Sequence, residues 1–218
     1  MPRKLTHQEL IQRQQEIVQR KGEVTSPLFP FSVVLNNIRS LYNVGSIFRT
    51  ADGVGVEKLW LCGITGTPES DPPKPSAGFV HSLGRITPSS VAKRERIEKT
   101  ALGAEKTVPW EHASDILPVI RNLKRSGYQI VLLEQTKESV PYQEFEPKSP
   151  VCLVVGNEIS GISDELLALS DAAVEIEMAG TKNSLNVTVA FGIVAYYMRN
   201  RLIQTVNYTL PSPFMGEG

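Results

Sequence analysis

The amino-acid sequence predicts an α/β domain built on a mostly parallel β-sheet flanked by helices. Its strand-like runs, such as VCLVVG (151–156), are apolar at almost every position rather than at alternate positions. Strands of a parallel sheet have this pattern because helices cover both of their faces. Segments with helical spacing separate these runs along the chain, which is the order of elements that a parallel sheet requires. A length of 218 residues, without an internal repeat, suits one such domain.

The predicted elements alternate along the chain. The strands are expected at 32–37, 58–63, 106–110, 128–134, 151–156 and 172–178. The helices are expected at 5–20, 44–53, 89–102, 113–125, 163–169 and 184–200. Residues 64–88 are rich in Gly, Pro and Ser and predict a long loop. We therefore expect an N-terminal helical extension (1–30), a main domain (31–203) and a disordered tail (204–218).

Composition narrows the class of protein. The formal net charge is zero, which argues against a protein that only coats nucleic acid. Cys62 and Cys152 lie in apolar runs and are expected to be buried, and two cysteines with three scattered histidines cannot form a zinc site of familiar spacing. The polar N-terminus lacks a signal-peptide core, and no run reaches the roughly 18 apolar residues of a membrane span. We expect a cytoplasmic protein with no membrane segment and no metal.

Basic residues are concentrated between positions 82 and 106. Such a run can be the solvated face of a helix. It can also contact phosphates if the fold directs it at an RNA site. The sequence leaves both interpretations open.

In a parallel sheet, ligands bind beyond the carboxyl ends of the strands. The first segment at such an end is LNNIRSLYNVGSIFRTADGVGV (35–56), in which Asn43 is a suitable helix N-cap and Gly45 permits close backbone approach. Arg49 lies in the following helix, one position off its apolar face. Its side chain can extend to solvent, or it can meet an anionic or ribose group in the crevice.

Two later segments also follow predicted strands. In LVVGNEISGISDELL (153–167), Glu158 can bond locally or can hold a catalytic arginine or a ligand amine. In IEMAGTKNSLNVTVAFGIVAYYM (176–198), Ser184 marks the start of a helix whose N-terminus suits a carboxylate or phosphate. The helix at 184–200 is apolar on nearly every side, so a second subunit is expected to cover the face that the core does not. The pattern therefore predicts a homodimer.

Together, these segments resemble the three motifs of the SPOUT methyltransferases, in the TrmH (SpoU) branch. Residues 43–52 are similar to motif 1 (N-x-G-x-x-x-R-x-A-D), 154–161 to motif 2 (V-V-G-N-E-x-x-G) and 184–190 to motif 3 (S-L-N-V-T-V-A). The resemblance covers roughly residues 32–200. The glycine fingerprint of nicotinamide-dependent enzymes is missing, which argues against that class.

The resemblance implies a fold, a cofactor and an assembly. The C-terminal part of the sheet would be threaded into a deep trefoil knot, which periodicity cannot predict because knots are almost absent from proteins. The chain would form a homodimer and bind S-adenosylmethionine, bent, inside the knot. The implied cofactor contacts, many of them through backbone groups, are Val155, Gly156, Asn157, Glu158, Ile176, Met178, Leu185 and Asn186.

The resemblance also implies methyl transfer to a ribose 2′-hydroxyl of tRNA or rRNA, without a metal. Arg49 matches the arginine to which the family assigns activation of that hydroxyl. A guanidinium is a poor base, because its pKa exceeds about 12. We therefore hypothesise that Arg49 orients the hydroxyl and phosphate and stabilises developing charge. Asn43, Glu158, Ser184 and Asn186 are expected to shape the site. The alternatives are a non-catalytic RNA-binding or assembly factor on the same fold, and a SPOUT enzyme that methylates a base.

Overall fold

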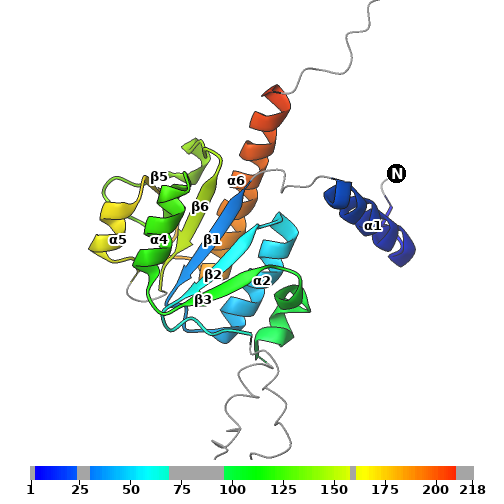
Figure 1. The fold of residues 1–218 in the computed structure, drawn as a ribbon, viewed down its shortest axis with the longest axis horizontal. Helices are drawn as coiled ribbons and strands as arrows, with labels where there is room; N and C mark the ends of the chain where they lie inside the picture. Colours follow the sequence, from blue (N-terminus) through cyan, green and yellow to red (C-terminus); the bar gives the residue numbers. More distant parts are fainter. Residues whose placement is uncertain (1–2, 24–29, 69–95, 158–160, 210–218) are drawn as a thin grey trace, which may run out of the picture.

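The computed structural model describes residues 3–23, 30–68, 96–157 and 161–209 (Figure 1). Its centre is a seven-stranded sheet in the order β3-β2-β1-β6-β4-β7-β5, and every neighbouring pair is parallel. The strands are β1 (Phe31–Asn36), β2 (Lys58–Cys62), β3 (Trp110–Ala113), β4 (Gln129–Leu133), β5 (Val140–Pro141), β6 (Val151–Val155) and β7 (Ala172–Glu175). The predicted α/β class with a parallel sheet is confirmed.

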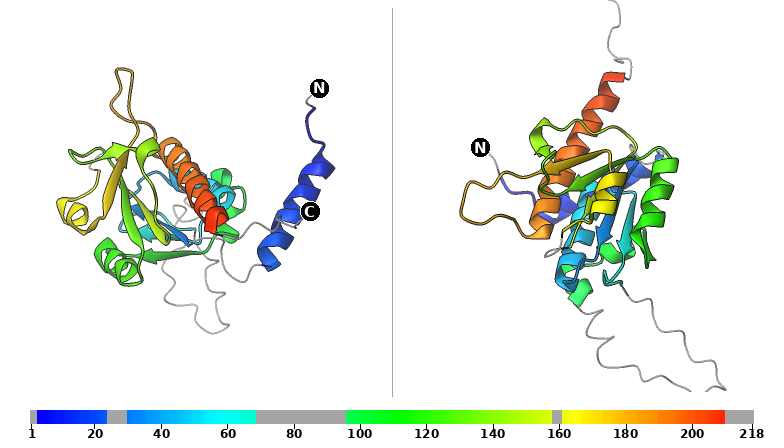
Figure 2. Two further views of the ribbon diagram at one scale, coloured as in Figure 1. Left: turned by 90° about the horizontal axis from the view of Figure 1, so that it is seen from above. Right: turned by 90° about the vertical axis from the view of Figure 1, so that its left-hand side faces the viewer.

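Helices cover both faces of this sheet. The α-helices are α1 (His7–Glu23), α2 (Leu41–Val54), α4 (Ile116–Arg125), α5 (Asp164–Leu169) and α6 (Val187–Thr209). Short 3-10 helices span Ala104–Lys106 (η1) and Tyr142–Glu144 (η2), and residues 96–101 are also helical. Figures 1 and 2 show α2 and α6 on one face of the sheet and α4 and α5 on the other.

The core is divided by the sheet into two layers. On β1, Val33 and Leu35 pack in the layer with α2 and α6, whereas Val34 packs in the layer with α4 and α5. All six residues of β1 are buried for this reason. Cys62 and Cys152 are buried and free, as expected. Burial, with a smaller contribution from the charge of Asp115, raises the pKa of Cys62 to about 12, so its thiol stays protonated at neutral pH.

Three local features differ from the predicted order of elements. The strand expected at 106–110 is replaced by η1 and by β3, which begins at Trp110 because Pro109 has no N–H to donate to a ladder. The link between the strands β4 and β6 contains the short strand β5, which pairs with β7. The tail predicted from residue 204 is helical as far as Thr209, since no helix-breaking residue occurs before Pro211. The remaining tail residues, most of the 64–88 loop and the basic segment before residue 96 lie outside the described residues.

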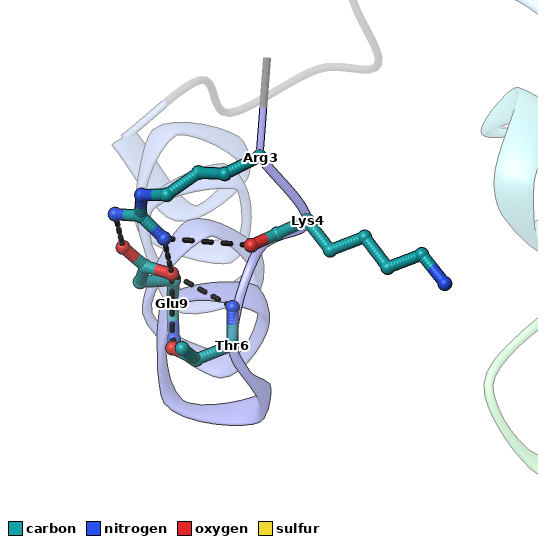
Figure 3. A network of polar contacts seen from close by, with 4 residues as sticks. All are labelled: Arg3, Lys4, Thr6 and Glu9. Carbon is teal, nitrogen blue, oxygen red and sulfur yellow. Dashed lines mark hydrogen bonds and ion pairs between the residues drawn. The ribbon is translucent and has the colours of Figure 1, made fainter. Parts of the chain in front are cut away.

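The N-terminal helix α1 begins with a capping box (Figure 3). The Thr6 N–H donates to Glu9 Oε2 at 2.7 Å, and the Glu9 N–H donates to Thr6 Oγ1 at 3.3 Å. Arg3 adds a bidentate pair with the same carboxylate. The hydrogen bonds from Arg3 and then from Thr6 lower the pKa of Glu9 to about 2.

Among the described helices, none has the length and apolarity that a membrane crossing requires.

Candidate functional site

The helices α2 and α6 start next to each other beyond the carboxyl ends of the strands. Asn186 Nδ2 donates to Asn43 Oδ1 at 3.4 Å, which joins the first and third sequence segments. Farther along, Arg199 Nε donates to the carbonyl of Val54 at 3.0 Å. The two helices therefore run in the same direction and lie side by side, and the functional residues near their starts are held together.

The residues that cap these two helices differ from the prediction. Ser40, rather than Asn43, is the N-cap of α2, and its side chain accepts from the Asn43 N–H at 3.3 Å. The helix begins three residues earlier than expected, because a serine in extended conformation at position 40 can satisfy a free N–H of the first turn. Asn43 is thereby placed in the first turn, where its side chain can face Asn186.

At the start of α6, Asn186 caps the helix in place of Ser184. Its Oδ1 accepts from the Thr188 N–H at 2.9 Å and from Thr188 Oγ1 at 2.6 Å. Since Asn186 also donates to Asn43, both ends of its amide are engaged, and its orientation is fixed. Ser184 lies in the exposed loop before the helix.

The second segment forms a turn at the end of β6. Asn157 Nδ2 donates to the carbonyl of Asn37 at 2.7 Å, and this bond joins the ends of β6 and β1. Asn37 has a φ of 60°, a conformation that asparagine tolerates better than most residues. The turn closes where the Gly161 N–H donates to the Asn157 carbonyl at 3.0 Å. Glu158 lies outside the described residues.

A cavity of about 620 Å³ opens at this edge of the sheet, within the range of roughly 300–1,000 Å³ that small-molecule sites occupy. Every described residue of the predicted cofactor set lines it. The described residues that line it are Leu133, Glu134, Gln135, Val155, Gly156, Asn157, Gly161, Glu175, Ile176, Met178, Asn183, Ser184, Leu185, Asn186, Val187 and Ala190. These residues combine apolar side chains, glycines and amides, and the charged ones among them are the acidic residues Glu134 and Glu175. A flat apolar ring with polar substituents suits such a cavity.

The backbone of the second segment is packed tightly at the cavity wall. A Cβ on Gly156 would lie 2.7 Å from Ile162 Cγ1 and 3.0 Å from the carbonyl of Gly161. Only glycine therefore allows the two sides of the turn to approach this closely. Because Gly156 has no side chain, a ligand in the cavity can approach the main chain there.

Three of the five predicted catalytic residues lie in or beside this cavity. Ser184 and Asn186 line it, and Asn43 contacts Asn186. Arg49 does not line the cavity. It is exposed on α2, one and a half turns beyond Asn43, and forms no hydrogen bond or ion pair within the part of the chain that the structure describes. Its guanidinium is therefore available to a ligand that approaches from solvent.

A fourth strand end was missed by the sequence analysis. Leu133, Glu134 and Gln135 follow or complete β4 and line the cavity. Gln135 Nε2 donates to the carbonyl of Asn183 at 2.9 Å and so fixes the loop that leads to α6. The signal was present, because polar residues directly follow an apolar strand there, as they do after β6.

Metal-ligating residues do not gather at this site. In the ranges that the structure describes, no three of the His, Cys, Asp and Glu side chains lie together as a metal site would require.

Comparison with known proteins identifies the same region. The SpoU rRNA Methylase family matches residues 76–196, more than half of the chain. A tRNA (guanosine(18)-2′-O)-methyltransferase of Aquifex aeolicus is 31% identical over 180 residues, which span 83% of this chain and 74% of that protein. The enzyme of the same description from Escherichia coli K12 is 28% identical, and the match spans 76% of this chain but only 61% of that protein.

Solved structures agree with the sequence comparison. The A. aeolicus TrmH/SpoU tRNA modifying enzyme superposes with a TM-score of 0.66 at 28% identity, covering 91% of this chain and 88% of that one. An AdoMet-bound rRNA methyltransferase from Sinorhizobium meliloti superposes with a TM-score of 0.65 at 27% identity, covering 81% of this chain and 61% of that one. The seven-stranded parallel sheet, the matched motifs and these relatives lead to one assignment. The chain belongs to the SpoU rRNA methylase family.

Proposed function

We propose that this protein is an S-adenosylmethionine-dependent RNA methyltransferase that modifies a ribose 2′-hydroxyl of tRNA or rRNA. The observation that carries the proposal is the cavity at the ends of β4, β6 and β7, with the Asn43–Asn186 contact at its rim. Relatives whose names state this activity on tRNA support the substrate class.

The residues present fit the cofactor. Apolar side chains such as Ile176, Met178 and Leu185 can pack against an adenine ring, and Gly156 and Asn157 line the same cavity, where their backbone groups can hydrogen-bond to its edge. When bound, S-adenosylmethionine supplies an electrophilic methyl group on sulfur, and the leaving group is a neutral thioether.

The chain's own contribution is alignment and charge. Arg49 can bind a substrate phosphate and ribose together, because a guanidinium presents several donors in one plane. Asn186 is fixed by its three hydrogen bonds and can hold the rim of the cavity in place. Ser184, and Glu158 after β6, complete the proposed site. In-line transfer requires such alignment and loss of the hydroxyl proton to a substrate phosphate oxygen or to water, since the leaving group is already activated.

A direct assay tests the function. The protein is incubated with unmodified tRNA or rRNA and methyl-labelled S-adenosylmethionine, and the RNA is digested to nucleosides and examined by mass spectrometry. We expect a 2′-O-methylnucleoside. A base-methylated nucleoside would refute the ribose assignment, and cofactor binding without turnover on any cellular RNA would favour an RNA-binding factor. Mapping 2′-O-methylation in cells with and without the gene then identifies the nucleotide.

The sheet order supports a knotted chain. The strand β6 is inserted between β1 and β4, and β7 is inserted between β4 and β5. Late segments thus enter between earlier ones, which is the arrangement that a trefoil knot of the C-terminal part would need. We propose that residues 31–203 form this knotted catalytic domain, preceded by the extension 1–30. We also place the enzyme in the cytoplasm, where tRNA and rRNA substrates are found.

We also propose a homodimer through α6, and the exposure of its side chains supports this proposal. One face of α6 is buried, with Phe191, Val194, Ala195 and Met198 inaccessible to solvent. On the other face Val189 is 49% exposed and Tyr196 is 45% exposed, and Tyr42 of α2 is 46% exposed. Exposed large apolar side chains on neighbouring helices are typical of an interaction site when they form one patch. A second copy of the chain would bury it.

Replacing Val189 by aspartate is expected to convert the dimer into a monomer. The change places an unpaired carboxylate in the proposed interface, whereas in the first turn of α6 a negative charge favours the helix itself. Sedimentation at micromolar concentration measures the mass. Leu102→Asp, at an apolar side chain that is 66% exposed outside α2 and α6, is the control and should remain dimeric. A monomeric wild-type protein would contradict the dimer.

A further inference from the structure

One carboxylate in the cavity wall has no role in the function proposed above. Glu134 directly follows β4, lines the cavity and is half-buried. Its Oε1 accepts a hydrogen bond from the Gln135 N–H at 3.1 Å. Its Oε2 lies beside Gly161, where a Cβ would be only 2.6 Å from that oxygen. Glycine at position 161, which also has a φ of 63°, therefore leaves the space that the carboxylate occupies.

Among the residues that the structure describes, Glu134 has no charged partner of the kind that a structural role would give it. Within the described ranges, no Lys, Arg or His forms an ion pair with Glu134, and no hydrogen bond reaches its Oε2. Glu175, the other acidic residue of the wall, differs because its Oε2 accepts from Ser139 Oγ at 2.7 Å. A half-buried carboxylate oxygen without a protein donor is suited to accept a hydrogen bond from a ligand.

The position of Glu134 in the sheet indicates which part of a ligand it meets. The strand β4 lies two places from β1, on the far side of β6. At about 4.8 Å per strand, its end is roughly 10 Å from the end of β1. The Asn43–Asn186 contact lies where α2, the helix that follows β1, meets α6. A cofactor whose methyl group faces Asn43 and Arg49 therefore has its nucleoside part toward β4 and β7.

We propose that Glu134 binds the ribose hydroxyls of the cofactor, an inference that rests on the proposed function. A carboxylate after a parallel strand is a suitable acceptor for a ribose hydroxyl, as it is in dinucleotide-binding sheets. The hydroxyl donates to Oε2, while Oε1 stays bonded to the Gln135 N–H. Glu134 is thus a residue that distinguishes a ribonucleoside cofactor from a deoxy analogue.

Calorimetric titration of the full-length protein tests this assignment. The probes are S-adenosylhomocysteine, its analogue without the two ribose hydroxyls, and 5′-methylthioadenosine, which lacks the amino-acid part. Wild-type protein is expected to bind S-adenosylhomocysteine about 10-fold or more tightly than the dihydroxyl-free analogue, as for a hydrogen bond to a charged group. Glu134→Ala should lose a similar factor for S-adenosylhomocysteine and for 5′-methylthioadenosine, with little loss for the analogue. Glu134→Gln, which still accepts a hydrogen bond, should lose less.

The control and the contrary outcomes are distinct. Glu138→Gln changes an exposed carboxylate in the same loop and should bind all three probes as the wild type does. If Glu134→Ala loses equal affinity for S-adenosylhomocysteine and for its dihydroxyl-free analogue, the assignment is overturned. It is also overturned if the variant loses affinity for S-adenosylhomocysteine but not for 5′-methylthioadenosine, because Glu134 would then bind the amine of the amino-acid part. If wild-type protein binds S-adenosylhomocysteine and the dihydroxyl-free analogue equally tightly, the assignment is overturned without any variant. A wild type that binds none of the probes would instead refute the proposed cofactor.

Discussion

Replacing Arg49 by alanine is expected to lower the rate of RNA methylation by about 10²–10³-fold, the usual loss when one charge-stabilising donor is removed from an active site. The affinity for S-adenosylhomocysteine and the melting temperature should not change, because Arg49 is exposed, does not line the cavity and bonds to none of the described residues. Single-turnover methylation, calorimetry and thermal unfolding measure the three quantities.

The Arg49→Lys variant tests whether methylation needs only the positive charge or also the planar guanidinium. It keeps the positive charge but cannot present two donors in one plane, so Arg49→Lys should retain most of the alanine variant's defect. Arg125→Ala, an exposed arginine at the end of α4 on the opposite face of the sheet, is the matched control and should methylate normally. Near wild-type methylation by the lysine variant would disprove bidentate binding by Arg49, and normal methylation by the alanine variant would remove it from the mechanism.

The convergence of the three motifs could be predicted because it depends on one rule of parallel sheets. Apolar runs identify the strands, and the polar residues that follow them must meet at the same edge. This rule selected the strand ends that contain Asn157, Met178 and Asn186, the family resemblance implied that these residues contact the cofactor, and they line one cavity. The same rule, applied to β4, would have included Glu134.

Other features depend on contacts between distant segments. The insertion of β6 between β1 and β4 follows from the packing of several strands at once, and no local pattern encodes it. The choice of Ser40 over Asn43 as the N-cap was missed because both residues are good caps by type. Only the pairing of Asn43 with Asn186, 143 positions away in the chain, shows which of them belongs to the site.

Gly45, the glycine of the first motif, is the position of the second large expected effect. Its replacement is expected to change the stability of the protein rather than its catalytic activity. Gly45 is buried in the first turns of α2, where the helical residues 96–101 cross it. A Cβ at this position would lie 2.3 Å from the carbonyl oxygen of Ile97 and 2.2 Å from Thr100 Oγ1. Thr100 Oγ1 also donates to the carbonyl of Tyr42 at 3.0 Å, so the two segments are held together there. Gly45 therefore serves helix packing and does not contact the cavity.

Gly45→Ala is accordingly expected to destabilise the protein by about 1–3 kcal/mol through overpacking. Helix propensity alone predicts the opposite, a gain of about 1 kcal/mol in the free energy of unfolding. The sign of the measured change therefore shows whether overpacking or helix propensity dominates. Thermal unfolding should show a loss of about 2–4 °C for each kcal/mol in a chain of this size. Gly53→Ala, in the same helix, meets only the hydroxyl end of Tyr196 at 2.7 Å, a side chain that can move. It should be neutral or stabilising.

The double variant Gly45→Ala, Thr100→Ala locates the cause of that loss. Removing Thr100 Oγ1 relieves one of the two close contacts, but the carbonyl of Ile97 belongs to the backbone and cannot give way without moving the whole segment 96–101. Stability should therefore recover only in part. Full recovery would assign the effect to the Thr100 side chain, and a stable single variant would show that α2 and residues 96–101 are not in close contact. A partial recovery instead ties the start of α2, and with it Asn43, to the backbone of the crossing segment.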